Sequence, residues 1–162
     1  LDRFDILYKE DNTIKDSKEV RSYLQSKKKK LFSYEIFENL DLSKGNYEEL
    51  EFQFSSFVGC NFTQSSWNKS HLLFSNLQNT MLKNTKMEKM KIFDTDFSGA
   101  TLEQVDFAGA KIKHVSFAGA KLIQVDFSKV LLAEEINFQD AQIVDCKFPE
   151  EVGSGLLYHE NR

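Results

Sequence analysis

The sequence predicts an all-β fold, a solenoid in which a short extended segment and a sharp turn repeat every five residues. Nineteen positions spaced five apart, from Leu42 to Leu132, all hold Leu, Ile, Phe, Met, Trp or Tyr. These six types make up only about 30% of the chain, so the period is not a chance pattern. The chain also has 15 Phe and 1 Pro, which indicates a core with many equivalent large apolar slots.

A second period of small or β-branched residues runs two positions before these centres, with Met90 as the large exception. Its members are Ser55, Cys60, Ser65, Ser70, Ser75, Thr80, Thr85, Thr95, Ala100, Val105, Ala110, Val115, Ala120, Val125 and Val130. A helix buries residues at a spacing of about 3.6 and an ordinary strand at a spacing of two, so neither explains this pattern. Glycines two residues after a centre, as at Gly59 and Gly99, fit a sharp turn there.

The pattern is imperfect at both ends. Leu40, Gly45 and Leu50 keep the second period poorly, so we expect the first coil to be distorted. After Glu134 the register slips by one residue and resumes with Phe138, which predicts a β-bulge at a coil corner.

The stretch DFSGATLEQVDFAGAKIKHVSFAGAKLIQVDFSK, residues 96–129, resembles the pentapeptide-repeat consensus: a small residue, Asp or Asn, Leu or Phe, then two polar residues. The resemblance covers about residues 40–148. It implies a right-handed quadrilateral parallel β-helix of about five and a half coils, with four pentapeptides in each coil of about 20 residues. The core centres of its most regular part are Phe97, Leu102, Phe107, Ile112, Phe117, Leu122 and Phe127.

We expect an N-terminal cap segment at 1–36, the β-helix at 37–150 and a C-terminal tail at 151–162. A short helix is predicted within residues 16–30, with Asp16 or Ser17 as its N-cap. The lysine run at its end is expected to be solvated, with nucleic acid or anionic lipid as the alternative partner.

The composition argues against several classes of function. Residues 1–34 carry a net charge of about +3, and residues 35–150 carry about −6 without any Arg, so we expect no direct nucleic-acid binding. No apolar run reaches the roughly 18 residues that a membrane span needs. On the implied coil, His71 and His114 lie two turns apart, too far for a shared metal ion, and no phosphate loop or nucleophile motif is present. We therefore expect no catalysis, no cofactor and no metal.

Two cysteines, Cys60 and Cys146, both stand at the small inward position. About four coils separate them on the implied solenoid, which is too far for a disulfide. We expect both to be inert core residues in a reducing compartment, the cytoplasm.

Large apolar residues also gather on one outward face of the implied coil, whereas the next face is small and almost uncharged. This candidate interface consists of Phe54, Leu73, Phe74, Phe93 and Leu131. Such a wall is normally covered or is an interface. Two covers remain open: the N-terminal segment, through the apolar stripe Val20, Tyr23 and Leu24, or a protein partner, including a second copy in a homodimer.

The predicted function is that of a non-enzymatic protein-binding module, a docking or effector scaffold whose partner the sequence does not identify. It would act in the cytoplasm or be secreted into a host cell as an effector. The quinolone-resistance proteins of this family are dimeric acidic rods that bind DNA gyrase and topoisomerase IV. The resemblance therefore implies topoisomerase protection as the alternative, although this chain is less acidic and no long loop interrupts its coils.

Overall fold

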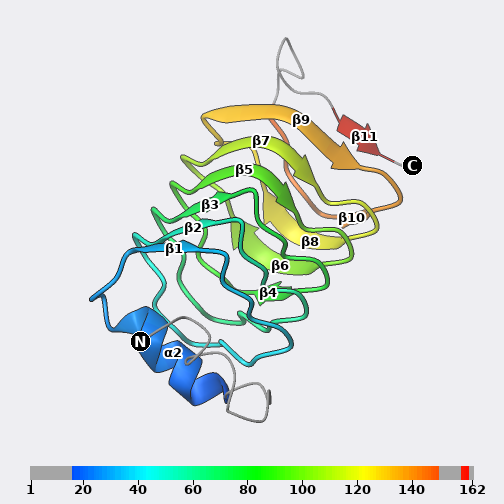
Figure 1. Cartoon of the computed structure of the whole chain (residues 1–162). Coiled ribbons are helices and arrows are strands. Elements are labelled where there is room, and N and C mark those ends of the chain that lie inside the picture. Colours follow the sequence, from blue (N-terminus) through cyan, green and yellow to red (C-terminus); the bar gives the residue numbers. More distant parts are fainter. Residues whose placement is uncertain (1–15, 150–157, 161–162) are drawn as a thin grey trace.

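The computed structural model describes residues 16–149 and the strand 158–160, and it shows a four-sided parallel β-solenoid of about six turns. One short helix lies at the N-terminal end (Figure 1). The predicted fold class is therefore confirmed. No helix in the described part of the chain is long and apolar enough to span a bilayer.

The described elements are α2 (Ser17–Gln25), β1 (Leu31–Ser33), β2 (Glu51–Gln53), β3 (His71–Leu73), β4 (Met81–Lys83), β5 (Lys91–Asp96), β6 (Thr101–Asp106), β7 (Lys111–Ser116), β8 (Lys121–Asp126), β9 (Leu132–Phe138), β10 (Gln142–Val144) and β11 (Tyr158–Glu160). One sheet has the order β1-β2-β3-β5-β7-β9-β11, and the opposite one has β10-β8-β6-β4. All pairs are parallel, and Phe52 pairs with Leu72 one turn later. In the early coils the other two sides are held by isolated bridges such as Asn46–Ser66.

The core is a set of columns in which each coil places an apolar residue above the corresponding residue of the previous coil. The seven residues named above as core centres are 0% exposed except Phe127, at 3%. The rings of Phe97 and Phe117 stack with centroids 5.3 Å apart, and those of Phe117 and Phe138 with centroids 5.5 Å apart. Because the same slot recurs every turn, a ring that fits once fits repeatedly, which explains the excess of Phe.

The first coil is regular, contrary to the sequence-based expectation. Leu40 and Leu50 are buried, and the backbone N–H of Leu42 donates to the carbonyl of Asn61 over 2.8 Å. The solenoid also begins at β1, within the segment predicted to be the cap. Gly45 is explained by its neighbour, because a Cβ atom there would lie 2.2 Å from the Oη atom of Tyr47.

The register slip lies earlier than predicted. Asp106 pairs with Asp126 at an offset of 20, but Lys111 already pairs with Leu132 at an offset of 21, so the extra residue precedes Leu132 rather than following Glu134. As a result Ala133, not Leu132, stands opposite Ile112. Leu131 sits at the bulge and is 71% exposed.

Helix α2 closes the N-terminal end of the solenoid (Figure 1). Asp16 is its N-cap, with the Oδ1 atom accepting the N–H of Glu19 over 2.9 Å. Val20 and Leu24 are fully buried, and Tyr23 packs edge-on against Phe32 at 5.5 Å.

Polar contacts hold this cap in place. The guanidinium of Arg21 donates to the carbonyl of Asp41 over 2.6 Å, and Lys27 Nζ donates to the carbonyl of Glu48 over 2.7 Å. The apolar stripe of the helix thus covers the end of the core and does not cover the Phe54 wall. Residues 1–15, the rest of that segment, lie outside the described residues.

Candidate partner-binding groove

The strongest candidate site follows one corner of the solenoid, where the chain leaves the side formed by β1, β2 and β3. In successive coils this corner is occupied by Tyr34, Phe54, Phe74, Asp94, His114 and Glu135. Their φ angles lie between 50° and 59°, the left-handed region that produces the sharp turn. Each residue is one turn from the next, so six side chains form a single row along the rod.

The first three residues of this row, Tyr34, Phe54 and Phe74, form what we call the aromatic ladder. Ring centroids are 5.3 Å apart between Tyr34 and Phe54 and 5.0 Å apart between Phe54 and Phe74, with interplanar angles of 9° and 8°. The residues are 55%, 48% and 53% exposed, respectively. The rings cover each other's faces and leave their edges to solvent.

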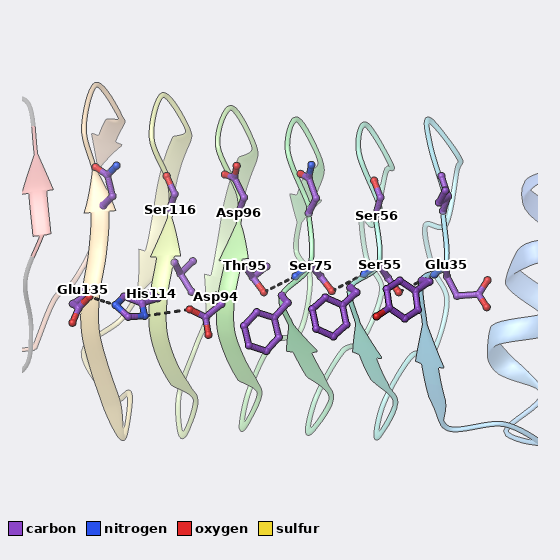
Figure 2. Close-up of a pocket in the computed structure, with 17 residues that line it drawn as sticks. Glu35, Ser55, Ser56, Ser75, Asp94, Thr95, Asp96, His114, Ser116 and Glu135 are labelled. Atoms are coloured by element: carbon purple, nitrogen blue, oxygen red, sulfur yellow. Dashed lines mark hydrogen bonds and ion pairs between the residues drawn. The ribbon is translucent and has the colours of Figure 1, made fainter.

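The other three residues, Asp94, His114 and Glu135, form the charged cluster. His114 lies between the two carboxylates, with its Nδ1 atom 3.2 Å from Asp94 Oδ1 and its Nε2 atom in contact with Glu135 Oε2 (Figure 2). Among the described residues, no group of three or more potential ligands is arranged to hold a metal ion. The row is therefore apolar in its N-terminal half and charged in its C-terminal half.

A groove of about 890 Å³ runs beside this row. One wall is the aromatic ladder and the charged cluster, and the other wall is formed by residues two positions later in each coil. That second wall and the floor comprise Ile36, Ser56, Asn76, Asp96, Ser116 and Asn137, with Glu35, Ser55, Ser75, Thr95 and Val115. The residues that line the groove include four carboxylates but neither Lys nor Arg.

Hydroxyl groups fix the floor of the groove. Ser55 Oγ accepts the N–H of Glu35 over 3.1 Å, Ser75 Oγ accepts that of Ser55 over 3.3 Å, and Thr95 Oγ1 accepts that of Ser75 over 3.4 Å (Figure 2). The Ser55 and Ser75 hydroxyls also donate to backbone carbonyls within their own coils. The floor is thus internally hydrogen-bonded, and none of these hydroxyls is paired with a general base.

Asp96 on the second wall is held in its charged form. Burial raises the pKa of its carboxyl, but hydrogen bonds from Ser98 and Gln78 outweigh that effect and keep the pKa below its ordinary value. The Nε2 atom of Gln78 donates to Asp96 Oδ2 over 2.6 Å. The groove therefore keeps a negative charge on the wall opposite the charged cluster.

The structure brings some of the predicted interface residues together and separates others. Phe54 and Phe74 are in the aromatic ladder, whereas Leu73 and Phe93 are half-buried in the adjacent column, paired through β3 and β5. Leu131 lies apart, at the bulge that opens the last coil. Sequence reasoning missed Tyr34 because it fell inside the predicted cap, although its spacing of 20 before Phe54 was a signal.

The cysteines offer no reactive centre. Both are free, and Cys60 is buried while Cys146 is half-buried. Burial raises the pKa of the Cys60 thiol to about 12, and its Sγ atom donates to the carbonyl of Phe37 over 3.3 Å. A protonated thiol in this setting is a poor nucleophile.

Comparison with known proteins agrees with the fold. No curated protein matches the chain. Among solved structures, a trypsin-treated form of QnrB1, a plasmid-mediated fluoroquinolone resistance protein, aligns with 21% identity and a TM-score of 0.69 over 74% of this chain. A pentapeptide repeat protein from the thylakoid lumen of Arabidopsis thaliana aligns with 18% identity and a TM-score of 0.56, over 68% of this chain and 74% of that one.

These likenesses show the fold alone, and this chain spans only 60% of the QnrB1 chain. A family model described as a pentapeptide repeat region matches residues 60–138, just under half of the chain. Together with the five-residue period and the four-sided coil, this match identifies residues 60–138 of the solenoid as a pentapeptide repeat region.

Proposed function

We propose that this chain is a protein-binding module that docks its partner along the groove beside the aromatic ladder. The observation that supports the proposal is the ladder itself, three stacked rings that are each about half exposed in one continuous row. Because about half of each ring stays exposed, the coil forgoes roughly half of the 1.5–3 kcal/mol that full burial of such a side chain provides. Contiguous exposed apolar surface of this kind typically marks an interface.

Comparison with the opposite corner argues against a purely structural origin. There the equivalent turn positions are polar or charged: Lys44, Gln64, Asn84, Gln104, Gln124 and Asp145. Their φ angles lie in the same left-handed region, so the turn does not require aromatic residues. The ladder is thus a property of one corner rather than of the coil.

The chemistry of the groove favours a protein partner over nucleic acid. Its lining carries carboxylates and neither Lys nor Arg, whereas phosphate backbones are bound mainly through those two residues. The two free cysteines of the chain fit a reducing compartment. The proposal assigns no catalytic step to any residue.

The test compares two double variants of the full chain. Phe54→Ser with Phe74→Ser removes two of the three rings of the ladder. Met81→Ser with Val144→Ser, the control, removes two apolar side chains on the opposite side of the solenoid, which are 39% and 48% exposed. Each protein is immobilised, exposed to an extract of its source cell and analysed by quantitative mass spectrometry with crosslinking. We expect a partner that the intact chain and the control variant retain and the ladder variant loses. Equal retention by all three proteins would refute the proposal.

A further inference from the structure

We propose that the groove takes an extended, polyproline-type segment of a partner protein, whose apolar residues lie on the aromatic ladder and whose Lys or Arg residues lie against Asp94, Asp96 and Glu135. This inference rests on the proposed function and specifies the partner's chemistry. It follows from the width of the groove, its backbone, its rings and its charge.

The width of the groove favours an extended chain. Its two walls come from residues two positions apart in each coil, such as Phe54 and Ser56, so their Cα atoms are at most roughly 7 Å apart. A helix with its side chains is about 10 Å across, wider than this spacing, whereas an extended chain fits between the walls.

The backbone of the groove leaves no strand edge for pairing. The N–H of Phe54 donates to the carbonyl of Leu73 over 3.0 Å, that of Phe74 to Phe93 over 3.0 Å, and that of Ser56 to Glu35 over 2.8 Å. A partner therefore cannot add as a further β-strand beside these residues and must be held mainly by side chains. A polyproline II segment suits such a site because it forms no backbone ladder of its own.

The rings of the ladder also select their ligand. Since Tyr34 and Phe74 cover the two faces of Phe54, a cation cannot sit over that ring, and the exposed edges carry partial positive charge. Ring edges pack well against aliphatic side chains and attract carbonyl oxygens through their partial positive charge. An extended proline-rich segment presents both groups. The apolar part of the ligand therefore belongs at this end of the groove.

The other end is negative. Asp94 and Glu135 flank His114 on one wall, and Asp96 lies on the other. Asp94 is one coil beyond Phe74, about 5 Å along the axis, and Glu135 is three coils beyond, about 14 Å. At about 3.1 Å per residue, a basic residue two to five positions after the last apolar residue meets these carboxylates.

The test uses a labelled synthetic peptide, Leu-Pro-Pro-Leu-Pro-Pro-Leu-Pro-Arg-Pro-Arg, titrated with the full chain and followed by fluorescence anisotropy. Matched peptides carry Glu in place of each Arg, or Ser in place of each Leu. We expect saturable binding of the first peptide and affinity at least tenfold lower for both others. The double variant Asp94→Asn with Glu135→Gln should bind the Arg peptide several-fold more weakly than the intact chain does, and the Glu peptide no more weakly. Met81→Ser should change neither affinity.

Several outcomes would overturn the inference. These are equal binding of the Arg and Glu peptides, no binding of any peptide, or preferential binding of a single-stranded thymidine oligonucleotide. A chain that is dimeric in sedimentation and becomes monomeric with Phe74→Ser would assign the groove to a second copy. Binding that appears only after residues 1–15 are deleted would assign it to the chain's own N-terminus. If a partner still depends on the ladder in the capture experiment, the proposed function stands while this account of its ligand fails.

Discussion

The change Gly45→Ala should destabilise the first coil, because a single added methyl group would overlap a buried ring. A Cβ atom at this position would lie 2.2 Å from Tyr47 Oη, 2.3 Å from Cζ and 2.8 Å from Cε2. The ring is fully buried, and its hydroxyl donates to the carbonyl of Leu42 over 2.7 Å, so it cannot swing aside without losing that bond. Overpacking a filled core costs about 1–3 kcal/mol, and overlap with three ring atoms places this change near the upper limit.

A double-mutant cycle separates steric overlap from other effects. Tyr47→Leu alone should cost about 2–4 kcal/mol through the cavity that it leaves. In the double variant the new methyl group occupies part of that cavity, so the two costs should fall short of additivity by about 1–3 kcal/mol. Gly119→Ala is the glycine control, since its Cβ would meet nothing within 4 Å although its φ is +65°. It should cost about 1 kcal/mol from backbone strain alone.

The measurement is urea unfolding followed by far-ultraviolet circular dichroism, with the free energy of unfolding obtained by linear extrapolation. If Gly45→Ala costs no more than Gly119→Ala, the reasoning is wrong. Additive costs in the double variant would also refute it.

Three further predictions concern the core, the turns and the alternative function. Phe107→Ala should lower the free energy of unfolding by about 3–5 kcal/mol. Glu103→Ala, which breaks only an exposed ion pair, should lower it by less than about 1 kcal/mol, and equal losses in urea would contradict the inward assignment. Burial raises the pKa of Asp126, but the hydrogen bonds from Ser128, together with the charges of Lys147 and Lys129, outweigh that effect and hold the pKa below its ordinary value. The charged Asp126 therefore adds to the free energy of unfolding above the unfolded pKa of about 3.9, and this contribution is lost as pH falls through the lower folded pKa. Asp126→Asn should flatten the dependence of stability on pH in this range. In a gyrase supercoiling assay with a quinolone we expect no protection, and protection would favour topoisomerase binding.

The core could be predicted from sequence because each inward slot accepts only one kind of residue. A column that is apolar in one coil must be apolar in the next, so a simple count located Phe97, Phe107 and Phe117 without a structure. The bulge could not be located this way, because Leu132 suits an inward slot better than Ala133, which stands opposite Ile112 in the structure. Only the pairing of Lys111 with Leu132 shows where the extra residue lies.

Compensation between neighbours also escapes a position-by-position pattern. Gly45 violates the second period because the ring of Tyr47 fills its volume, so the two residues together make one regular coil. Phe54 and Phe74 were found because they are 20 residues apart, but Tyr34 was excluded by the predicted boundary at 36. The alternation of Asp94, His114 and Glu135 was hidden by the bulge, which shifts the last of them by one residue.

The ladder itself can be tested as a functional feature rather than a structural one. Phe74 and Asn84 occupy equivalent corners of the same coil, and both have φ of 51°. Asn tolerates the left-handed region better than Phe does, at a difference of very roughly 1 kcal/mol. Stacking of Phe74 on Phe54 stabilises the coil by about 0.5–1.5 kcal/mol, which nearly offsets the backbone strain of Phe at this position.

Phe74→Asn should therefore change the free energy of unfolding by less than about 1 kcal/mol, unlike the core change at Phe107. The same variant should lose the partner that the intact chain captures, because the end of the ladder nearest the charged cluster is gone. Urea titration and the capture experiment on one preparation give both readings. A loss of more than about 2 kcal/mol would mean that the ladder stabilises the coil, and its exposure would then be no argument for binding. Unchanged stability with loss of the partner would identify this corner as a place where stacked rings are kept in water for recognition.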